Sequence, residues 1–135
     1  METTELVLLK KLEKCWNTLD ASNLESLLSE DVIYESQHVL NCIDYKYELI
    51  DYFHGKFLTI KEEMNSRLIL INATVGYIPK MNMRPCIVLS QIIGDQLNQS
   101  TVLIEIKDSL ISRIDLCFIP DPKEVIFSKL KNKFN

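Results

Sequence analysis

Apolar residues recur at helical spacing near the start of the chain. Between residues 5 and 19 they fall every three or four positions, which predicts a helix with one apolar stripe. The stripe consists of Leu6, Leu9, Leu12, Trp16 and Leu19. Because such a stripe must be buried, this helix is expected to face the core.

Two more helices are predicted before the strands begin. Ser22 and Glu25 fit a capping box, in which each side chain satisfies a free backbone N–H of the other, and this predicts a short helix reaching Leu28. Asp44 is the expected N-cap of a third helix. Its apolar side carries Ile50, Phe53, Phe57 and Ile60. Gly55 within it costs about 1 kcal/mol relative to Ala, and close packing against a neighbour would explain its presence.

From Arg67 onward the pattern is typical of strands. Four runs rich in Ile, Val, Leu and Thr predict an antiparallel meander, with turns in DQLNQ and KDSL. The runs are 67–77, 85–94, 100–107 and 110–119. Several are apolar at consecutive positions, so both sheet faces are expected to be covered, in part by a second subunit. A homodimer is therefore predicted.

A final helix is predicted from Asp121. Asp121, Pro122 and Glu124 suit the N-cap, N1 and N3 positions, and the apolar residues that follow are spaced by four. These are Ile126, Leu130 and Phe134. The helix is expected to fold back over the sheet.

Composition narrows the class of protein. The 135 residues suit one domain, 1–135, and the formal charge of -4 argues against a broad nucleic-acid surface. No apolar stretch approaches the roughly 20 residues that span a bilayer, so a soluble, cytoplasmic protein is expected, without a membrane partner. The four cysteines are dispersed and no metal-ligand spacing or phosphate loop is present, so neither metal nor cofactor is predicted.

Two stretches resemble a known family. CWNTLDASNLESLLSEDVIYESQHVLNCIDYKYELIDYF resembles the N-terminal half of the nuclear transport factor 2-like, or SnoaL-like, superfamily, and VLIEIKDSLISRIDLCFIPDP resembles its closing hairpin. The resemblance implies an α+β fold: a cone-shaped, curved antiparallel or mixed sheet wrapped around the N-terminal helices. It also implies an open end that can hold a small ligand, commonly in a homodimer.

The strand VIYESQHVL is the predicted edge strand and supplies most candidate site residues. Side chains alternate along a strand, so Val32, Tyr34, Ser36 and His38 share one face, which in the family lines the cone. His38 titrates near neutrality and is the candidate general base, with Tyr34 orienting a substrate. The alternative is that His38 lies at the strand end, satisfied by backbone or solvent.

The ketosteroid isomerases of this superfamily offer a sharper comparison. Their donor tyrosine position falls on Cys15 and their base aspartate position on Ser36. A thiol is a weak donor and a serine hydroxyl is not a base at neutral pH, so that chemistry is not expected. Cys15 and Ser36 stay in the candidate ligand-binding set with Tyr34, His38 and Trp16. Trp16 belongs to the helical stripe and is otherwise a core residue.

Two functions follow from these features. The first is binding of a small, largely apolar ligand in the cone, with catalysis of the lyase or isomerase type left open. The second is a non-enzymatic interaction domain, such as an immunity protein that neutralises a basic toxin, which the pI of about 5.2 favours. Glu105 and Asp115 on the last two strands either share a proton or belong to a cross-strand charge network with Lys107 and Arg113.

Overall fold

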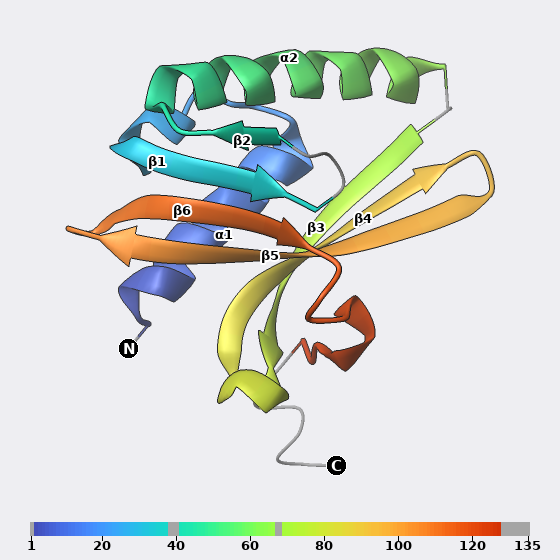
Figure 1. The fold of residues 1–135 in the computed structure, drawn as a ribbon. Helices are drawn as coiled ribbons and strands as arrows, with labels where there is room; N and C mark the ends of the chain where they lie inside the picture. The colour runs from blue at the N-terminus through green and yellow to red at the C-terminus, as the bar shows by residue number, and fades with distance from the viewer. Residues whose placement is uncertain (1, 38–40, 67–68, 128–135) are drawn as a thin grey trace.

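The computed structural model describes residues 2–37, 41–66 and 69–127, which form an α+β fold (Figure 1). The helices are α1 (Thr4–Thr18) and α2 (Lys46–Asn65). The strands are β1 (Leu28–Ser36), β2 (Asn41–Ile43), β3 (Ile69–Ile78), β4 (Arg84–Ile93), β5 (Gln96–Lys107) and β6 (Leu110–Cys117). Single 3-10 turns are η1 (Leu24–Ser26), η2 (Pro79–Met81) and η3 (Pro122–Glu124).

The strands form one open, curved sheet of mixed direction in the order β2-β1-β6-β5-β4-β3. Strands β3 to β6 make the predicted antiparallel meander, and β1 pairs in parallel with β6. The prediction that β1 is an edge strand is wrong. Strand β1 ends at Ser36. Strand β2 pairs with β1 and takes the edge position in its place, with Tyr34 opposite Ile43.

Both helices pack on the same face of the sheet, called the inner face here. Helix α1 runs along that face and α2 crosses one end of it, next to β1 and β2 (Figure 1). The predicted apolar stripes are buried between them, with Trp16 of α1 and Phe53 of α2 both 1% exposed. The helices therefore form because their apolar sides match a sheet that buries them.

The boundaries of the helices differ from the prediction. Leu19, the C-cap of α1, is in the left-handed conformation (φ 53°), and the Asp20 side chain accepts a bond from Ser22 N–H at 2.9 Å. That bond replaces the predicted capping box of Ser22 with Glu25, and only the turn η1 forms there. Tyr45, rather than Asp44, is the N-cap of α2, without a side-chain capping bond.

The hairpin turns explain the strand lengths. Asp108 and Ser109 both have positive φ (54° and 65°) and form the predicted tight turn between β5 and β6. The turn between β4 and β5 instead uses Gly94, with φ 63°, and Asp95. Strand β5 therefore begins at Gln96, earlier than predicted, because glycine adopts this conformation without steric cost.

The predicted C-terminal helix is wrong for the described residues. Asp121 caps a single 3-10 turn, accepting from Lys123 N–H at 2.9 Å, and Val125 returns to extended backbone. Ile126 then exchanges two backbone hydrogen bonds with Tyr77 of β3, so pairing with the sheet edge replaces the helix. The segment does fold back over the outer face, where Val125 packs in a second apolar cluster. Leu130 and Phe134 lie outside the described residues.

Side chains of α1 satisfy the backbone of the β3 edge. Asn17 donates to Ala73 O at 2.8 Å and accepts from Ala73 N–H at 2.7 Å, while Glu13 accepts from Val75 N–H at 2.6 Å. With the Ile126 pairing at Tyr77, these bonds occupy the groups that another strand would use. This part of the edge is therefore closed to strand addition. In the described chain, neither helix has the length and apolarity to cross a membrane.

Candidate functional site at the mouth of the cone

Strand β1 alternates as predicted over its described residues. Val32, Tyr34 and Ser36 are 0%, 1% and 8% exposed and face inward, whereas Glu35 is exposed. His38 lies outside the described residues, so its role as a base stays a prediction. The strand thus delivers a phenol and a hydroxyl to the inner face.

Aromatic side chains fill the deep part of the cone. The Trp16 ring lies 5.5 Å from Phe53 and 5.0 Å from Phe57, measured between ring centroids, and Tyr34 lies 5.4 Å from Phe53 and 5.5 Å from Tyr52. The contacts are mostly edge-on, the arrangement that aromatic quadrupoles favour. Trp16 is therefore a core residue of the packed interior.

The Tyr34 hydroxyl is a buried polar group at the boundary of this core. Among the described residues it has no hydrogen-bond partner of good geometry, although the hydroxyls of Tyr52 and Ser36 lie beside it. Burial, followed by the neighbouring Tyr52 phenol, raises the pKa of Tyr34. The phenol stays protonated at neutral pH and can donate.

A hollow of about 200 Å³ lies between α2 and the inner face of the sheet, near the ends of β1 and β6, and it is named the mouth hollow here. It is lined by Ser36, Tyr52, Lys56, Leu89, Gln91, Asn98, Ser100 and Leu116. The sheet register brings these residues together: Gln91 faces Asn98 across β4 and β5, and Leu89 faces Ser100. Hydroxyl, amide and ammonium groups share this lining with the apolar side chains of Leu89 and Leu116, and it includes no carboxylate from the described residues.

A more open groove of about 540 Å³ adjoins the mouth hollow along α2, and we call it the α2 groove. Both spaces share Tyr52, Lys56 and Gln91. The other lining residues are Asp51, Gly55, Thr59, Ile60, Glu63 and Ile69. A Cβ added at Gly55 would meet nothing within 4 Å, so the expectation that close packing explains this glycine is wrong. The absent side chain leaves the groove open.

Lys56 is the cation shared by the two spaces. Its ammonium lies 5.4 Å from the centroid of the Trp16 ring and 5.7 Å from that of Tyr52. Lys56 is half-buried and forms no ion pair with a carboxylate in the described chain. The aromatic faces hold the charge by cation–π attraction and leave its hydrogen-bonding capacity for another group.

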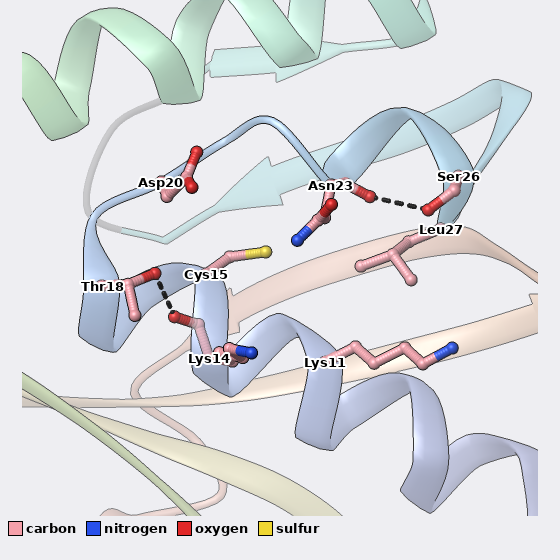
Figure 2. A pocket seen from close by; sticks show the side chains of 8 residues that line it. All are labelled: Lys11, Lys14, Cys15, Thr18, Asp20, Asn23, Ser26 and Leu27. Atoms are coloured by element: carbon pink, nitrogen blue, oxygen red, sulfur yellow. Dashed lines mark hydrogen bonds between the residues drawn. The ribbon is translucent and has the colours of Figure 1, made fainter.

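Cys15 lies in a different cavity from the other candidates. This space of about 450 Å³ lies between α1 and the loop that precedes β1. Figure 2 shows the Cys15 thiol directed into it, toward Asn23 and Leu27. Hydroxyls at its rim are already used, since Thr18 donates to Lys14 O and Ser26 donates to Asn23 O. The predicted grouping of Cys15 with Tyr34 and Ser36 is therefore wrong, because the thiol and the inward face of β1 open into separate spaces.

Thiol reactivity should follow burial, even though Cys15 lines a cavity. Burial, with a contribution from the Asp20 carboxylate, raises the pKa of Cys15 to about 11, and burial raises the pKa of Cys86 to about 12. Only the thiolate reacts with a disulfide reagent. At pH 8 we expect the exposed Cys42 to react with Ellman's reagent first, and Cys15 and Cys86 to react only after denaturant is added. Fast labelling of Cys15 in the folded Cys42→Ser variant would contradict the burial of its thiol.

The other charged candidates lie on the outer face. Arg113 donates to Asp115 at 3.0 Å and pairs with Glu35 at 2.8 Å, and Glu105 is opposite Arg113 in the register. The ion pairs of Arg113 confirm the charge-network prediction for Asp115, whereas the role of Glu105 and Lys107 in it stays a prediction. His54 is exposed on α2. No group of three or more His, Cys, Asp or Glu side chains in the described ranges could hold a metal ion.

Most mouth residues were missed by sequence reasoning. Tyr52 and Lys56 lie one helical turn apart and flank the predicted apolar side of α2, which was the available signal. Gln91 and Asn98 meet only through the hairpin register, and Ser100 lies in a run of apolar residues. Of the predicted set, Ser36 lines the hollow. Tyr34 and Trp16 do not line it, and the Trp16 ring lies beside Lys56, which does.

Comparison with solved structures places the fold in a known class. A steroid delta-isomerase from Pseudomonas aeruginosa superposes with a TM-score of 0.64 and 12% identity, over 87% of this chain and 80% of that one. An NTF2-like protein of unknown function from Mesorhizobium loti superposes with a TM-score of 0.64 and 9% identity, over 84% of this chain and 89% of that one. An LEH-like epoxide hydrolase from M. tuberculosis superposes with a TM-score of 0.58 and 11% identity, over 84% of this chain and 81% of that one.

The chain therefore has the nuclear transport factor 2-like fold, as the resemblance implied. No protein-family model and no curated protein sequence matches it. At these identities the likeness concerns the fold alone, so the function has to come from the site.

Proposed function

We propose that the protein binds a small molecule in the mouth hollow. The observation that carries this proposal is a space of about 200 Å³, lined by both polar and apolar side chains, beside an aromatic, tightly packed interior. Converging donors in a concave site are typical of ligand pockets, although most such pockets exceed roughly 300 Å³. The part of the ligand that enters this hollow is accordingly small and able to accept hydrogen bonds.

The similar structures support this choice, since they include proteins described as a steroid delta-isomerase and an epoxide hydrolase. Lys56 and Tyr52 are the titratable groups in the described lining of the hollow. Catalysis of the lyase or isomerase type would need a base, and His38 keeps that role as a prediction. Binding requires no such group and is the function the geometry supports best.

A fragment screen by ligand-observed NMR tests the proposal, with small polar acids, amides and alcohols as probes. Wild-type protein should bind members of the set, and Gln91→Leu should weaken them because it removes an amide from the hollow at nearly constant volume. The matched control is Gln96→Leu, at an exposed position outside the lining. Equal weakening by both variants, or an absence of binders, would count against the hollow.

We also propose a homodimer that forms through the outer face of the sheet. Leu70, Ile92 and Leu97 are 53%, 42% and 59% exposed and lie opposite one another across β3, β4 and β5. A contiguous apolar row of this kind is typical of an interaction surface. The alternative partner, a basic protein, rests on the acidic pI and stays a prediction.

The charge variant Leu97→Glu should convert the dimer to a monomer, because it buries a carboxylate without a counter-ion in the proposed interface. Leu58→Glu on α2 is the control, since Leu58 is similarly exposed (49%) but lies outside the row. Sedimentation equilibrium at micromolar concentration gives the masses. A wild-type monomer would overturn the proposed dimer.

A further inference from the structure

We infer that the ligand is an amphipathic organic anion, with a carboxylate in the mouth hollow beside Lys56 and an apolar body in the α2 groove. This inference rests on the proposed function and specifies its ligand class. It is drawn from two independent features, the charges around the hollow and the shape of the adjoining groove.

The charges favour an anionic head group. Lys56 brings a half-buried ammonium to a lining that holds no carboxylate among the described residues. Around it stand neutral donors, the side-chain amides of Gln91 and Asn98. Hydrogen bonds from charged or neutral donors to a carboxylate are shorter and stronger than those between neutral groups. Where solvent is partly excluded, the attraction between opposite charges is also screened less.

The groove favours an apolar body attached to that head. Its floor includes Ile60 and Ile69, and Gly55 leaves space where any other residue would project. At about 540 Å³ it exceeds the hollow and falls within the range of pockets that hold small organic molecules. Because Lys56 belongs to both linings, one molecule can occupy both spaces with its charged end at the lysine.

Two carboxylates also line the α2 groove and restrict the orientation. Asp51 lies four residues before Gly55 on α2, and Glu63 lies eight residues after it. Residues four or eight apart lie on the same side of a helix, so both carboxylates border the side that Gly55 opens. Neither lines the mouth hollow. They would repel an anionic head from the groove, so the carboxylate is directed toward Lys56 and the uncharged chain toward Gly55.

The experiment compares three probes by isothermal calorimetry and amide NMR: octanoate, its neutral isostere octanamide, and acetate, which is the head group alone. We expect octanoate to bind about tenfold or more tightly than octanamide, the range of a hydrogen bond to a charged group. Acetate should bind more weakly than octanoate. The NMR shifts on octanoate addition should involve the Gln91 and Asn98 side-chain amides.

Two variants with matched controls separate the head from the body. Lys56→Met should remove the preference for octanoate over octanamide, whereas Lys61→Met, at an exposed lysine of α2 outside both linings, should keep it. Gly55→Leu should weaken octanoate and leave acetate unchanged, whereas Gly55→Ala should change octanoate binding little.

The outcomes distinguish this inference from the proposed function. Equal affinities for octanoate and octanamide, or a preference that survives Lys56→Met, would overturn the anionic ligand while small-molecule binding in the hollow stands. Octanoate binding that is insensitive to Gly55→Leu would overturn the placement of the chain. Fragment binding without any octanoate binding would also refute the inference, and an absence of every small-molecule binder would refute the proposed function as well.

Discussion

Trp16→Ala should lower the free energy of unfolding by about 3–5 kcal/mol, the range for removing a large aromatic side chain from a core. Trp16 is 1% exposed and contacts Phe53 and Phe57, so its loss leaves a cavity between α1 and α2. It also removes one of the two rings beneath the Lys56 ammonium. Urea denaturation followed by circular dichroism measures the change.

Tyr45→Ala is the control for Trp16→Ala, because Tyr45 is an aromatic residue with 52% exposure. It should change the free energy of unfolding by less than about 1 kcal/mol, as is usual for surface positions. Similar losses for the two variants would show that Trp16 does not lie at the centre of the packed interior. The interior would then have room for a ligand deeper than the mouth hollow.

Gly76→Ala should destabilise the fold by about 1–3 kcal/mol, the usual cost of overpacking. An added Cβ would lie 2.5 Å from Val125 Cγ1 and 2.9 Å from the backbone oxygen of Ile126, so the segment from Pro120 must move away from β3. Hydrogen exchange of the Tyr77 and Ile126 amides, which bond each other's carbonyl, should speed up. Denaturant melts and exchange NMR measure both effects.

Gly55→Ala is the opposite case and serves as the comparison. Its Cβ would meet nothing, and alanine favours a helix over glycine, so stability should rise by about 1 kcal/mol. If Gly76→Ala raised stability as Gly55→Ala is expected to, the C-terminal segment would not pack on Gly76 as described. The pair therefore reports on the strand edge and the α2 groove separately.

The parts of the fold that depend on local periodicity could be predicted from the sequence. The stripes of α1 and α2 and the four meander strands follow from residue spacing, and so does the inward set of β1, Val32 to Ser36. The prediction of the last helix was wrong because Ile126 forms two backbone hydrogen bonds with Tyr77. Local capping signals contain no information about such a long-range pairing. The predicted edge position of β1 was wrong for the same reason, since β2 pairs with β1 and forms the edge of the sheet.

The candidate site was predicted only in part, because its residues are assembled by register. Ser36 and Tyr34 come from a strand whose alternation is readable. Gln91 and Asn98 face each other because Gly94 and Asp95 form the turn, and a turn placed later, as predicted, would pair different residues. Cys15 was assigned by analogy with another protein's position, and the loop after α1 gives it a separate cavity.

A crystal structure of the protein soaked with octanoate tests the central claim most directly. The result expected here is electron density for a carboxylate between Lys56 and the β4–β5 pair Gln91 and Asn98, with the chain running along Gly55. Density only in the cavity beside Cys15, or a mouth hollow closed by the Lys56 and Gln91 side chains with no ligand present, would contradict it.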